Sequence, residues 1–260
     1  MSTQFAMDNA LSSTQIAGYE ENGFLILRGV FPPSTCDAYR QRMIDLATGA
    51  ETLQGFAIHE PYTRTFNQHL YDPACAQWML HPRLQQPLET LVGGRVEAMQ
   101  TMHFFRGSQH RHHQDQYYLP ECLAVWIPFE DVSERNGTIF IEPGSHRRQL
   151  VTKENLPKPA QMDPMQHQHQ VYFPAVEKIA LESGVDPVLV EIEKGDICIF
   201  HGRTIHGGTT PSEPELSRHV LAAHYLPYNA EKWDRDWPRF SFDGSRRVRF
   251  INAEGQLITD

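Results

Sequence analysis

The chain has 260 residues, of which 40% are hydrophobic and 21% are charged, so it has enough apolar material for a core and is neither disordered nor collagen-like. Its 23 Lys and Arg against 32 Asp and Glu give a net charge of -9, which argues against nucleic acid as a partner. No run of 18 apolar residues and no signal-peptide pattern is found, so we expect a cytoplasmic protein without a membrane partner.

The first part of the chain, about 12–94, is predicted to be mainly helical and to support the rest of the fold. Ser12 and Gln15 have the spacing of a capping box, and Gly23 is placed to end the helix that follows. The elements expected here are, in chain order, a helix at 12–22, a strand at 24–30, a helix capped by Ser34 that runs towards Gly49, and a helical pair within 73–92.

From residue 95 the hydrophobic period changes to two, which indicates β-strands. Even-numbered positions from 96 to 104 form an apolar face whose polar member is Gln100, and we expect this face to point into the core. Further apolar strands are expected at 123–132, 138–142, 188–192, 197–200 and 219–226, with turn signals between them. The pattern predicts an all-β core at about 95–228.

Two long segments, 147–187 and 229–260, are left without predicted helices or strands. Residues from about 147 to 187 lack clear periodicity and are too long for an ordinary connection, so we expect a lid-like insertion in the β core. Residues 229–260 are expected to be a C-terminal extension, and 1–260 is expected to be a single domain. The four cysteines are widely spaced and are expected to be reduced thiols. The sequence predicts no particular oligomeric state.

A candidate metal site lies in the histidine-rich stretch between two of these strands. His113 and Asp115 form an H-x-D motif, and on an extended backbone they would face the same way. His206, which follows an apolar strand, is the candidate third ligand. Two histidines and one carboxylate on one face of an ion are the ligand set of non-haem Fe(II) oxygenases, which leaves three positions open for a cosubstrate and O₂. These three residues are therefore the predicted metal-binding and catalytic residues.

A candidate anion-binding residue, Arg218, lies twelve positions after His206, across a polar turn. If the flanking strands formed a hairpin centred near Ser212, the two side chains would lie on the same face. A guanidinium fixed beside a metal suits a dicarboxylate that chelates iron at one end and pairs with Arg at the other. That description fits 2-oxoglutarate.

Four ordered blocks of the sequence carry a family resemblance. They are IAGYEENGFLILRGVF, then FFRGSQ with HHQDQYYLP, then AVWIPFEDVSERNGTIFIEPGSH, and finally GDICIFHGRTIHGGTTPSEPELSRHVLAAHY. In these blocks the chain resembles the phytanoyl-CoA hydroxylase-like Fe(II)/2-oxoglutarate dioxygenases, which include ectoine hydroxylase. The resemblance implies an oxidoreductase that is mainly β with flanking helices around a double-stranded β-helix (jelly-roll, cupin-like) core. It makes His113, Asp115 and His206 the iron ligands and Arg218 the partner of the distal carboxylate of 2-oxoglutarate.

The resemblance also bears on residues outside this set. It puts Trp126 where such enzymes often contact 2-oxoglutarate. A hydroxyl residue often stands two places after the distal histidine, but here that place is Gly208, so Thr209 is the candidate hydroxyl donor. A buried Gln100 needs a partner, which is either a structural hydrogen bond or a substrate. Its spacing to Arg106 resembles the substrate-reading strand of ectoine hydroxylase, and both are candidate substrate-binding residues.

The other histidines of this region have ordinary structural interpretations. His110 and His112 adjoin the motif, but on an extended backbone they would face away from His113. Three later histidines are expected to be packed or hydrogen-bonded within the core, namely His201, His219 and His224.

These residues together predict hydroxylation of a C–H bond in a small-molecule substrate, with formation of succinate and CO₂. Five basic residues favour a small polar or anionic metabolite, namely His103, Arg106, His110, Arg111 and His112. Other outcomes use the same ligands: desaturation, ring formation or endoperoxidation of a lipophilic natural product. Hydrolysis at zinc, or metal or ligand binding by a non-catalytic cupin-like protein, are the alternatives from other classes.

Overall fold

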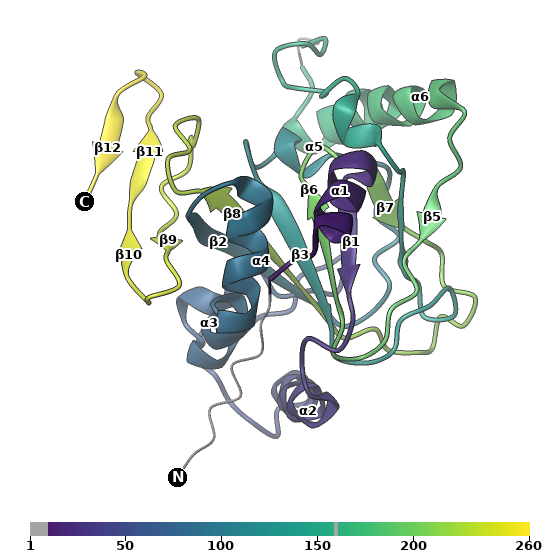
Figure 1. The fold of residues 1–260 in the computed structure, drawn as a ribbon, viewed down its shortest axis with the longest axis vertical. Coiled ribbons are helices and arrows are strands. Elements are labelled where there is room, and N and C mark those ends of the chain that lie inside the picture. The colour runs from purple at the N-terminus through teal and green to yellow at the C-terminus, as the bar shows by residue number, and fades with distance from the viewer. Residues whose placement is uncertain (1–9, 159–160) are drawn as a thin grey trace.

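The computed structural model describes residues 10–158 and 161–260, and it is built around two antiparallel sheets that face each other (Figure 1). The larger sheet has seven strands in the order β1-β6-β3-β8-β2-β9-β10, and the smaller has three in the order β5-β4-β7. A separate hairpin pairs β11 with β12. This arrangement confirms the prediction of a mainly β, jelly-roll-type fold with flanking helices.

The strands of the larger sheet are β1 (Phe24–Leu27), β2 (Val96–Phe104), β3 (Leu123–Pro128), β6 (Ile197–His201), β8 (Val220–Pro227), β9 (Arg239–Phe240) and β10 (Arg246–Arg247). The smaller sheet contains β4 (Ile139–Ile141), β5 (Val188–Leu189) and β7 (His206–Gly208), and the hairpin contains β11 (Arg249–Ile251) and β12 (Leu257–Thr259). Each strand expected after residue 95 is present, although several are shorter than predicted.

The helices are α1 (Ser13–Asn22), α2 (Pro33–Thr48), α3 (Pro73–Met79), α4 (Pro82–Val92), α5 (Pro164–His167) and α6 (Phe173–Ser183). The capping box of Ser12 and Gln15 starts α1, and Gly23 ends it in the left-handed conformation, both as predicted. The cap predicted for α2 is wrong: the N-cap is Pro32, two residues before Ser34, and Ser34 lies inside the helix.

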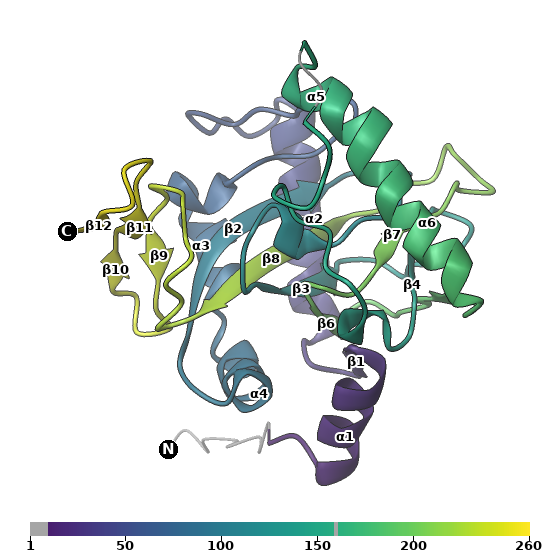
Figure 2. The same ribbon diagram turned by 90° about the horizontal axis from the view of Figure 1, so that it is seen from above.

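Helices α2, α3 and α4 cover the outer face of the larger sheet, so that sheet is buried on both sides (Figures 1 and 2). Odd-numbered residues of β3 and β8, such as Val125 and Leu221, pack in the cluster that includes Tyr39 and Trp78. Even-numbered residues, such as Trp126, turn towards the smaller sheet. Because side chains alternate along a strand, each strand supplies the helical core with one face and the space between the sheets with the other.

Strand β2 departs from the single inward face that the sequence predicts. Its pairing with β8 shifts between Ala98 and Gln100, which is a β-bulge. Val96 and Ala98 therefore pack with the helices, whereas Gln100, Met102 and Phe104 line a cavity between the sheets. The even-numbered positions do not form one face, because the extra residue of the bulge reverses the alternation.

The lid-like insertion at 147–187 contains a helical segment that periodicity did not reveal. Residues 164–183 run through α5, a wide turn at 168–172 and α6. Tyr172, Phe173 and Val176 pack with Ile205, which directly precedes β7. The Tyr172 hydroxyl also exchanges hydrogen bonds with the backbone of Gln114. The described part of the insertion is thus fastened to the loop that carries the H-x-D motif.

The C-terminal extension adds to the larger sheet on the side away from α6 (Figures 1 and 2). Glu97 of β2, whose side chain is 1% exposed, accepts two hydrogen bonds from Arg247 at 2.7 and 2.8 Å. The fully buried Arg239 lies 3.7 Å from the same carboxylate. Two arginines of the extension therefore share one buried acid of the core. Among the described residues, no helix is long and apolar enough to cross a membrane.

We expect Glu97→Ala to lower the free energy of unfolding by about 3–5 kcal/mol, because it leaves Arg239 buried without a counter-charge. Urea denaturation checks this value. Glu213→Ala is the matched control, because the Glu213–Arg135 pair is exposed and screened by solvent, so its loss should affect stability far less. Equal effects of the two substitutions would contradict a structural role for the buried cluster.

Candidate active site

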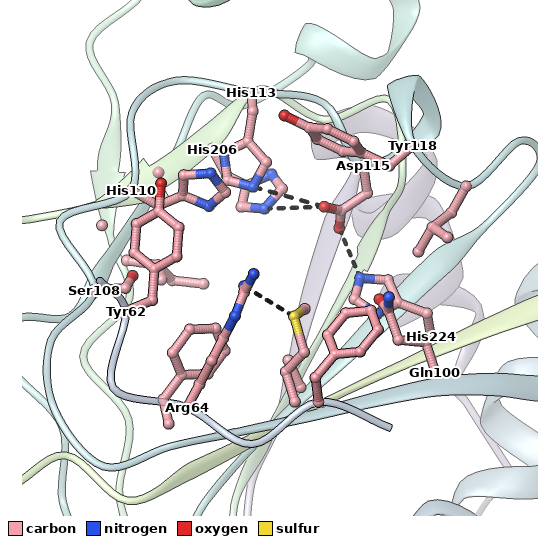
Figure 3. A pocket seen from close by; sticks show the side chains of 18 of the residues that line it. Tyr62, Arg64, Gln100, Ser108, His110, His113, Asp115, Tyr118, His206 and His224 are labelled. Carbon is pink, nitrogen blue, oxygen red and sulfur yellow. Dashed lines mark hydrogen bonds and ion pairs between the residues drawn. The ribbon is translucent and has the colours of Figure 1, made fainter. Parts of the chain in front are cut away.

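A cavity of about 470 Å³ lies between the two sheets. Strands β2, β3, β7 and β8 contribute to its walls, as do the segment 60–66, the lid-like insertion and the C-terminal extension. Its volume falls in the ordinary range of small-molecule sites. Figure 3 shows the polar side chains that converge on it.

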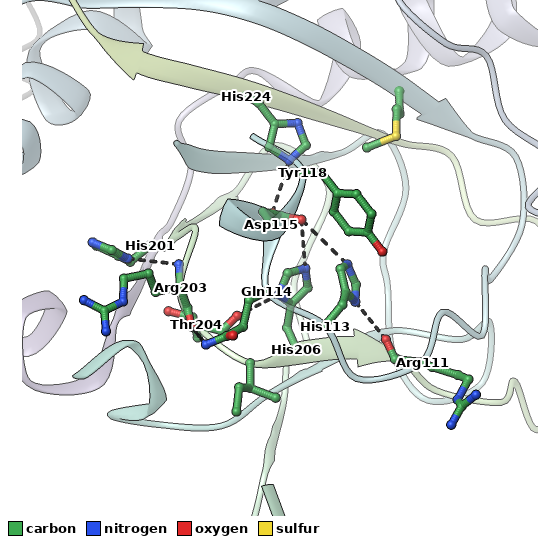
Figure 4. A network of polar contacts seen from close by, with 12 residues as sticks. Arg111, His113, Gln114, Asp115, Tyr118, His201, Arg203, Thr204, His206 and His224 are labelled. Atoms are coloured by element: carbon green, nitrogen blue, oxygen red, sulfur yellow. Dashed lines mark hydrogen bonds and ion pairs between the residues drawn. The ribbon is translucent and has the colours of Figure 1, made fainter. Parts of the chain in front are cut away.

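The three predicted ligands meet on one wall of this cavity (Figures 3 and 4). The Nε2 atoms of His113 and His206 lie 3.6 and 3.8 Å from Asp115 Oδ1, and the three ligand atoms are all within 4.8 Å of one another. Metal ligands at about 2.1 Å and at right angles are about 3 Å apart. Only a small inward movement is needed for one ion to contact all three, so the residues fit a metal ion.

The backbone explains why these residues meet. His113 and His206 are opposite one another in an antiparallel bridge, and their backbones exchange hydrogen bonds of 2.9 and 3.1 Å. Directly opposite side chains are close neighbours, and the two rings are 4.1 Å apart. The expected extended backbone does not continue to Asp115, which begins a 3₁₀ turn at Asp115–Tyr117. The carboxylate still reaches the histidines from this turn.

Each histidine is oriented by the nitrogen that does not face the site. His113 Nδ1 is 2.8 Å from the carbonyl oxygen of Arg111, and His206 Nδ1 is 3.0 Å from that of Thr204 (Figure 4). A carbonyl only accepts, so both Nδ1 atoms carry the proton and both Nε2 lone pairs are free for a metal. Burial, with His110 and His206, lowers the pKa of His113 well below its ordinary value and keeps the imidazole neutral.

Asp115 is held by a histidine that we did not predict for the site. His224 Nε2 lies 3.2 Å from Asp115 Oδ2, so it holds the oxygen that does not face His113 and His206. Burial alone would raise the pKa of Asp115, but His206 and His224 keep it below its ordinary value, and the group stays a carboxylate. His224 is therefore a positioning residue that leaves Oδ1 for the metal.

We expect His224→Leu to weaken Fe(II) binding about 10- to 100-fold, the usual cost of removing a group that orients a metal ligand. His224→Gln, which keeps an N–H donor, should recover part of the loss. Anaerobic calorimetry measures both affinities. His219→Gln is the matched control, because this buried histidine pairs with His103 on the helical side of the sheet. Wild-type affinity in His224→Leu would remove the residue from this role.

Arg218 lies on the same cavity, but the predicted hairpin is wrong. His206 lies in β7 of the smaller sheet, whereas Arg218 lies two residues before β8 of the larger sheet. The connection between them crosses from one sheet to the other. Arg218 is 1% exposed, and its Nη1 donates to the carbonyl of Gly137 at 2.8 Å. Its guanidinium lies over Phe104 and Trp126, 5.3 and 5.5 Å from the ring centres.

The guanidinium of Arg218 has unused hydrogen-bonding capacity. Its Nε is buried without a hydrogen-bond partner, and Arg218 forms no ion pair among the described residues. Burial lowers its pKa to about 9, which leaves it cationic at neutral pH. A buried cation without a counter-ion is unfavourable unless a ligand supplies one. An anion in the cavity would provide it.

Thr209 is not placed as expected. It does not line the cavity, and its backbone N–H and hydroxyl both donate to the carbonyl of Thr138, at 2.8 and 3.0 Å. The hydroxyl that lines this part of the cavity belongs to Ser108. A Cβ on Gly208 would lie 2.9 Å from Ser108 Oγ and equally close to the backbone nitrogens of Gln109 and His110. Glycine at 208 thus allows the Ser108 segment to pack in.

Some of the predicted substrate-binding and cosubstrate-binding residues line the cavity and others do not. Gln100 and Trp126 line the cavity, and the Gln100 amide makes no hydrogen bond to any described residue, so the structural alternative for it is not observed. Arg106 is exposed, lies outside the cavity and donates to the carbonyl of Pro214 at 3.0 Å. The prediction that Arg106 contacts substrate is therefore not supported by its position, because the chain turns outward after β2.

The basic cluster that favoured an anionic substrate is also dispersed. Of its members, His110 lines the cavity. His103 is buried on the helical side, Arg111 pairs with Glu177 of α6, and His112 packs on Phe140. His110 does not face away from the motif as predicted, since its ring is 3.9 Å from that of His113.

Several residues that line the cavity were not predicted from the sequence. His224 could have been found, because Arg218, Ala222 and His224 are separated by even intervals and therefore share one face. Arg64 comes from a segment without periodicity, and Arg235 from the extension, so no pattern marked either residue.

Comparison with known proteins identifies a matching family and several similar proteins. The family described as phytanoyl-CoA dioxygenase (PhyH) matches residues 19–220. The peroxisomal phytanoyl-CoA dioxygenase of Rattus norvegicus is 24% identical over 248 residues, which cover 85% of this chain and 70% of the rat protein.

Solved structures of similar fold include EctD from S. alaskensis with 2-oxoglutarate and 5-hydroxyectoine. It has a TM-score of 0.63 and 18% identity, and the match covers 86% of this chain and 79% of EctD. The α-ketoglutarate-dependent epimerase SnoN from nogalamycin biosynthesis has a TM-score of 0.62 and 21% identity, with 82% of each chain covered. At these identities the likeness establishes a shared fold.

Proposed function

The chain belongs to the phytanoyl-CoA dioxygenase family, and on this basis we propose that it is a Fe(II)/2-oxoglutarate-dependent oxygenase that hydroxylates a C–H bond of a small molecule. The observation that carries the proposal is the meeting of His113, Asp115 and His206 on one wall of a cavity that Arg218 also lines. Two histidines and one carboxylate suit Fe(II) and leave positions open on its other side.

Bound Fe(II) supplies the redox chemistry that couples oxidative decarboxylation of 2-oxoglutarate by O₂ to oxidation of the substrate. The chain's own part is binding, orientation and exclusion of water. His113, His206 and the ionised Asp115 would hold the ion, and His224 fixes the carboxylate. In each imidazole Nδ1 donates to a backbone carbonyl, which leaves Nε2 as the nitrogen that faces the ion.

Arg218 receives the distal carboxylate of 2-oxoglutarate in this proposal. Its unpaired Nε and its burial support the role, because a charged, bidentate pair is strong where water is excluded. Trp126 and Phe104 flank the guanidinium and shield it. We assign the accompanying hydroxyl to Ser108 rather than Thr209, since Ser108 lines the cavity.

The test is a substrate panel incubated in air with the Fe(II)-loaded protein and 2-oxoglutarate. Small carboxylic, amino and phosphonic acids are compared with acyl-CoA thioesters and neutral lipophilic natural products. We expect succinate to form together with a product that is heavier by one oxygen atom, and neither to form when Zn(II) replaces Fe(II). A product lighter by two hydrogens would indicate desaturation or ring formation. Hydrolysis by the Zn(II) form, without 2-oxoglutarate turnover, would contradict the proposal.

A further inference from the structure

Arg64 is a second arginine of the cavity that the proposed iron and 2-oxoglutarate site does not use. It extends from the segment 60–66 into the cavity, on the wall opposite His113, Asp115 and His206 (Figure 3). The side chain is partly buried. Its position raises the question of which group it binds there.

The backbone of Arg64 is fixed before any ligand arrives. It forms isolated β-bridges with His59 and with Phe104 of β2, and it exchanges hydrogen bonds with His59 at 2.7 and 3.1 Å. On either side, Phe105 N–H donates to the Thr63 carbonyl and Thr65 N–H donates to the His103 carbonyl. A group held in this way loses little conformational freedom on binding, which favours affinity.

The guanidinium of Arg64 has no acidic partner among the described residues. Its single side-chain hydrogen bond is to the thioether of Met102, at 3.0 Å, and a thioether is a weak acceptor. It also lies over the rings of Tyr62 and Phe104, at 4.9 and 5.6 Å. By contrast, Arg42 and Arg239 lie outside the cavity, and each pairs with a buried carboxylate. Arg64 therefore differs from these two arginines, because it lies in the cavity and has no carboxylate partner among the described residues.

The charges of the cavity indicate what the partner is. With Fe(II) and 2-oxoglutarate bound, the three positive charges of the ion and Arg218 balance the three negative charges of Asp115 and the cosubstrate. Arg64 and Arg235 remain positive, and Glu60, the other acid of the lining, is exposed and accepts a hydrogen bond from Thr63. An unpaired charge away from water is costly, and a carboxylate fits the planar fork of a guanidinium.

We propose that Arg64 binds a carboxylate of the prime substrate, which makes the substrate an organic acid with an apolar body. This inference rests on the proposed function, because it takes the opposite wall to be the iron and 2-oxoglutarate site. The apolar body follows from the lining of the cavity, to which Phe66, Leu119 and Trp237 contribute. Phe66 and Trp237 pack edge to face at 5.6 Å and form an aromatic wall. Such a wall favours a hydrocarbon or aromatic chain over a polyhydroxylated one.

The inference can be tested by calorimetry on the protein loaded with Mn(II), in place of redox-active iron, and saturated with 2-oxoglutarate. The ligands are 3-phenylpropanoate and octanoate, each compared with its neutral amide. We expect at least one acid to bind at least about tenfold more tightly than its amide. Arg64→Gln should remove that preference, and Arg64→Lys should keep part of it. Arg106→Gln, which changes an exposed arginine outside the cavity, should behave as wild type.

Three results would overturn the inference. The first is that neither acid is preferred to its amide by the wild-type protein. The second is that Arg235→Gln, and not Arg64→Gln, removes the preference. The third is that Arg64→Gln weakens the binding of 2-oxoglutarate itself, which would make Arg64 a cosubstrate residue. Unaltered melting temperatures verify that the variants are folded. If 2-oxoglutarate does not bind to the wild-type metal-loaded protein at all, the proposed function fails, and this outcome is distinct from the three above.

Discussion

Asp115→Ala and His206→Ala should each weaken Fe(II) binding by more than about 100-fold, which exceeds the loss expected when only an orienting group is removed. Each substitution leaves two ligands on an ion that needs three protein contacts at this wall of the cavity. Succinate formation should fall below detection in both variants, since it depends on the bound ion. Anaerobic calorimetry with Fe(II) and a succinate assay measure the two effects.

The matched control for these variants is His112→Ala. His112 directly precedes a proposed ligand, but its ring packs against Phe140 at 4.4 Å and lies outside the cavity. Its loss should leave the iron affinity within about twofold of wild type, and thermal unfolding should show that all three variants fold. Wild-type iron affinity and turnover in both Asp115→Ala and His206→Ala would refute the ligand assignment.

Arg218→Leu should raise the 2-oxoglutarate concentration required for half-maximal turnover about 100-fold. The substitution removes a buried, charge-assisted pair, and such hydrogen bonds contribute about 1.5–3 kcal/mol each. The Fe(II) affinity should stay at the wild-type value, because none of the three metal ligands has changed. Arg218→Lys should restore part of the affinity, since it keeps the charge but loses the bidentate geometry.

Arg106→Leu serves as the control for Arg218→Leu, because it removes an arginine that is exposed and outside the cavity. It should not alter the requirement for 2-oxoglutarate. If Arg218→Leu also left that requirement unchanged, the carboxylate partner would have to be another cavity arginine. Arg64 would be the first to examine, and the inference about the substrate would then fail as well.

The sequence predicted well those features that depend on neighbouring residues. Continuous apolar runs reveal β3, β6 and β8 because both faces of each strand are buried. The capping box at Ser12 marks the start of α1 without reference to the rest of the fold. The H-x-D motif alone is weak in a chain with fourteen histidines. It stood out together with His206 and Arg218, because two histidines and one carboxylate are the ligand set of non-haem Fe(II) oxygenases.

Features that depend on distant contacts were predicted less well. The hairpin between His206 and Arg218 was wrong because strand pairing is decided by the whole sandwich, and here the connection crosses between sheets. The bulge at Ala98 and Gln100 shifts the register through pairing with β8, which alternation within β2 does not reveal. Arg64 reaches the cavity because its segment lies along β2, a contact that no local pattern marks.

Thr209 and Arg106 were assigned to the site from their positions in the sequence, but neither side chain lines the cavity. Thr209 follows the position expected for a hydroxyl, but its side chain is held by the Thr138 carbonyl. The close approach of Ser108 to Gly208 brings another hydroxyl to the cavity from a different segment. Packing between segments, and not order along the chain, decides which side chain faces the site.

We propose that one Fe(II) and one 2-oxoglutarate bind together in this cavity, through His113, Asp115, His206 and Arg218. The most direct test is an anaerobic titration of the Fe(II)-loaded protein with 2-oxoglutarate, followed by visible absorption. We expect a metal-to-ligand charge-transfer band that saturates at one equivalent of 2-oxoglutarate in the wild-type protein. The band should be absent in Asp115→Ala and should need far more 2-oxoglutarate in Arg218→Leu. An iron-loaded wild-type protein that develops no such band at saturating 2-oxoglutarate would contradict it.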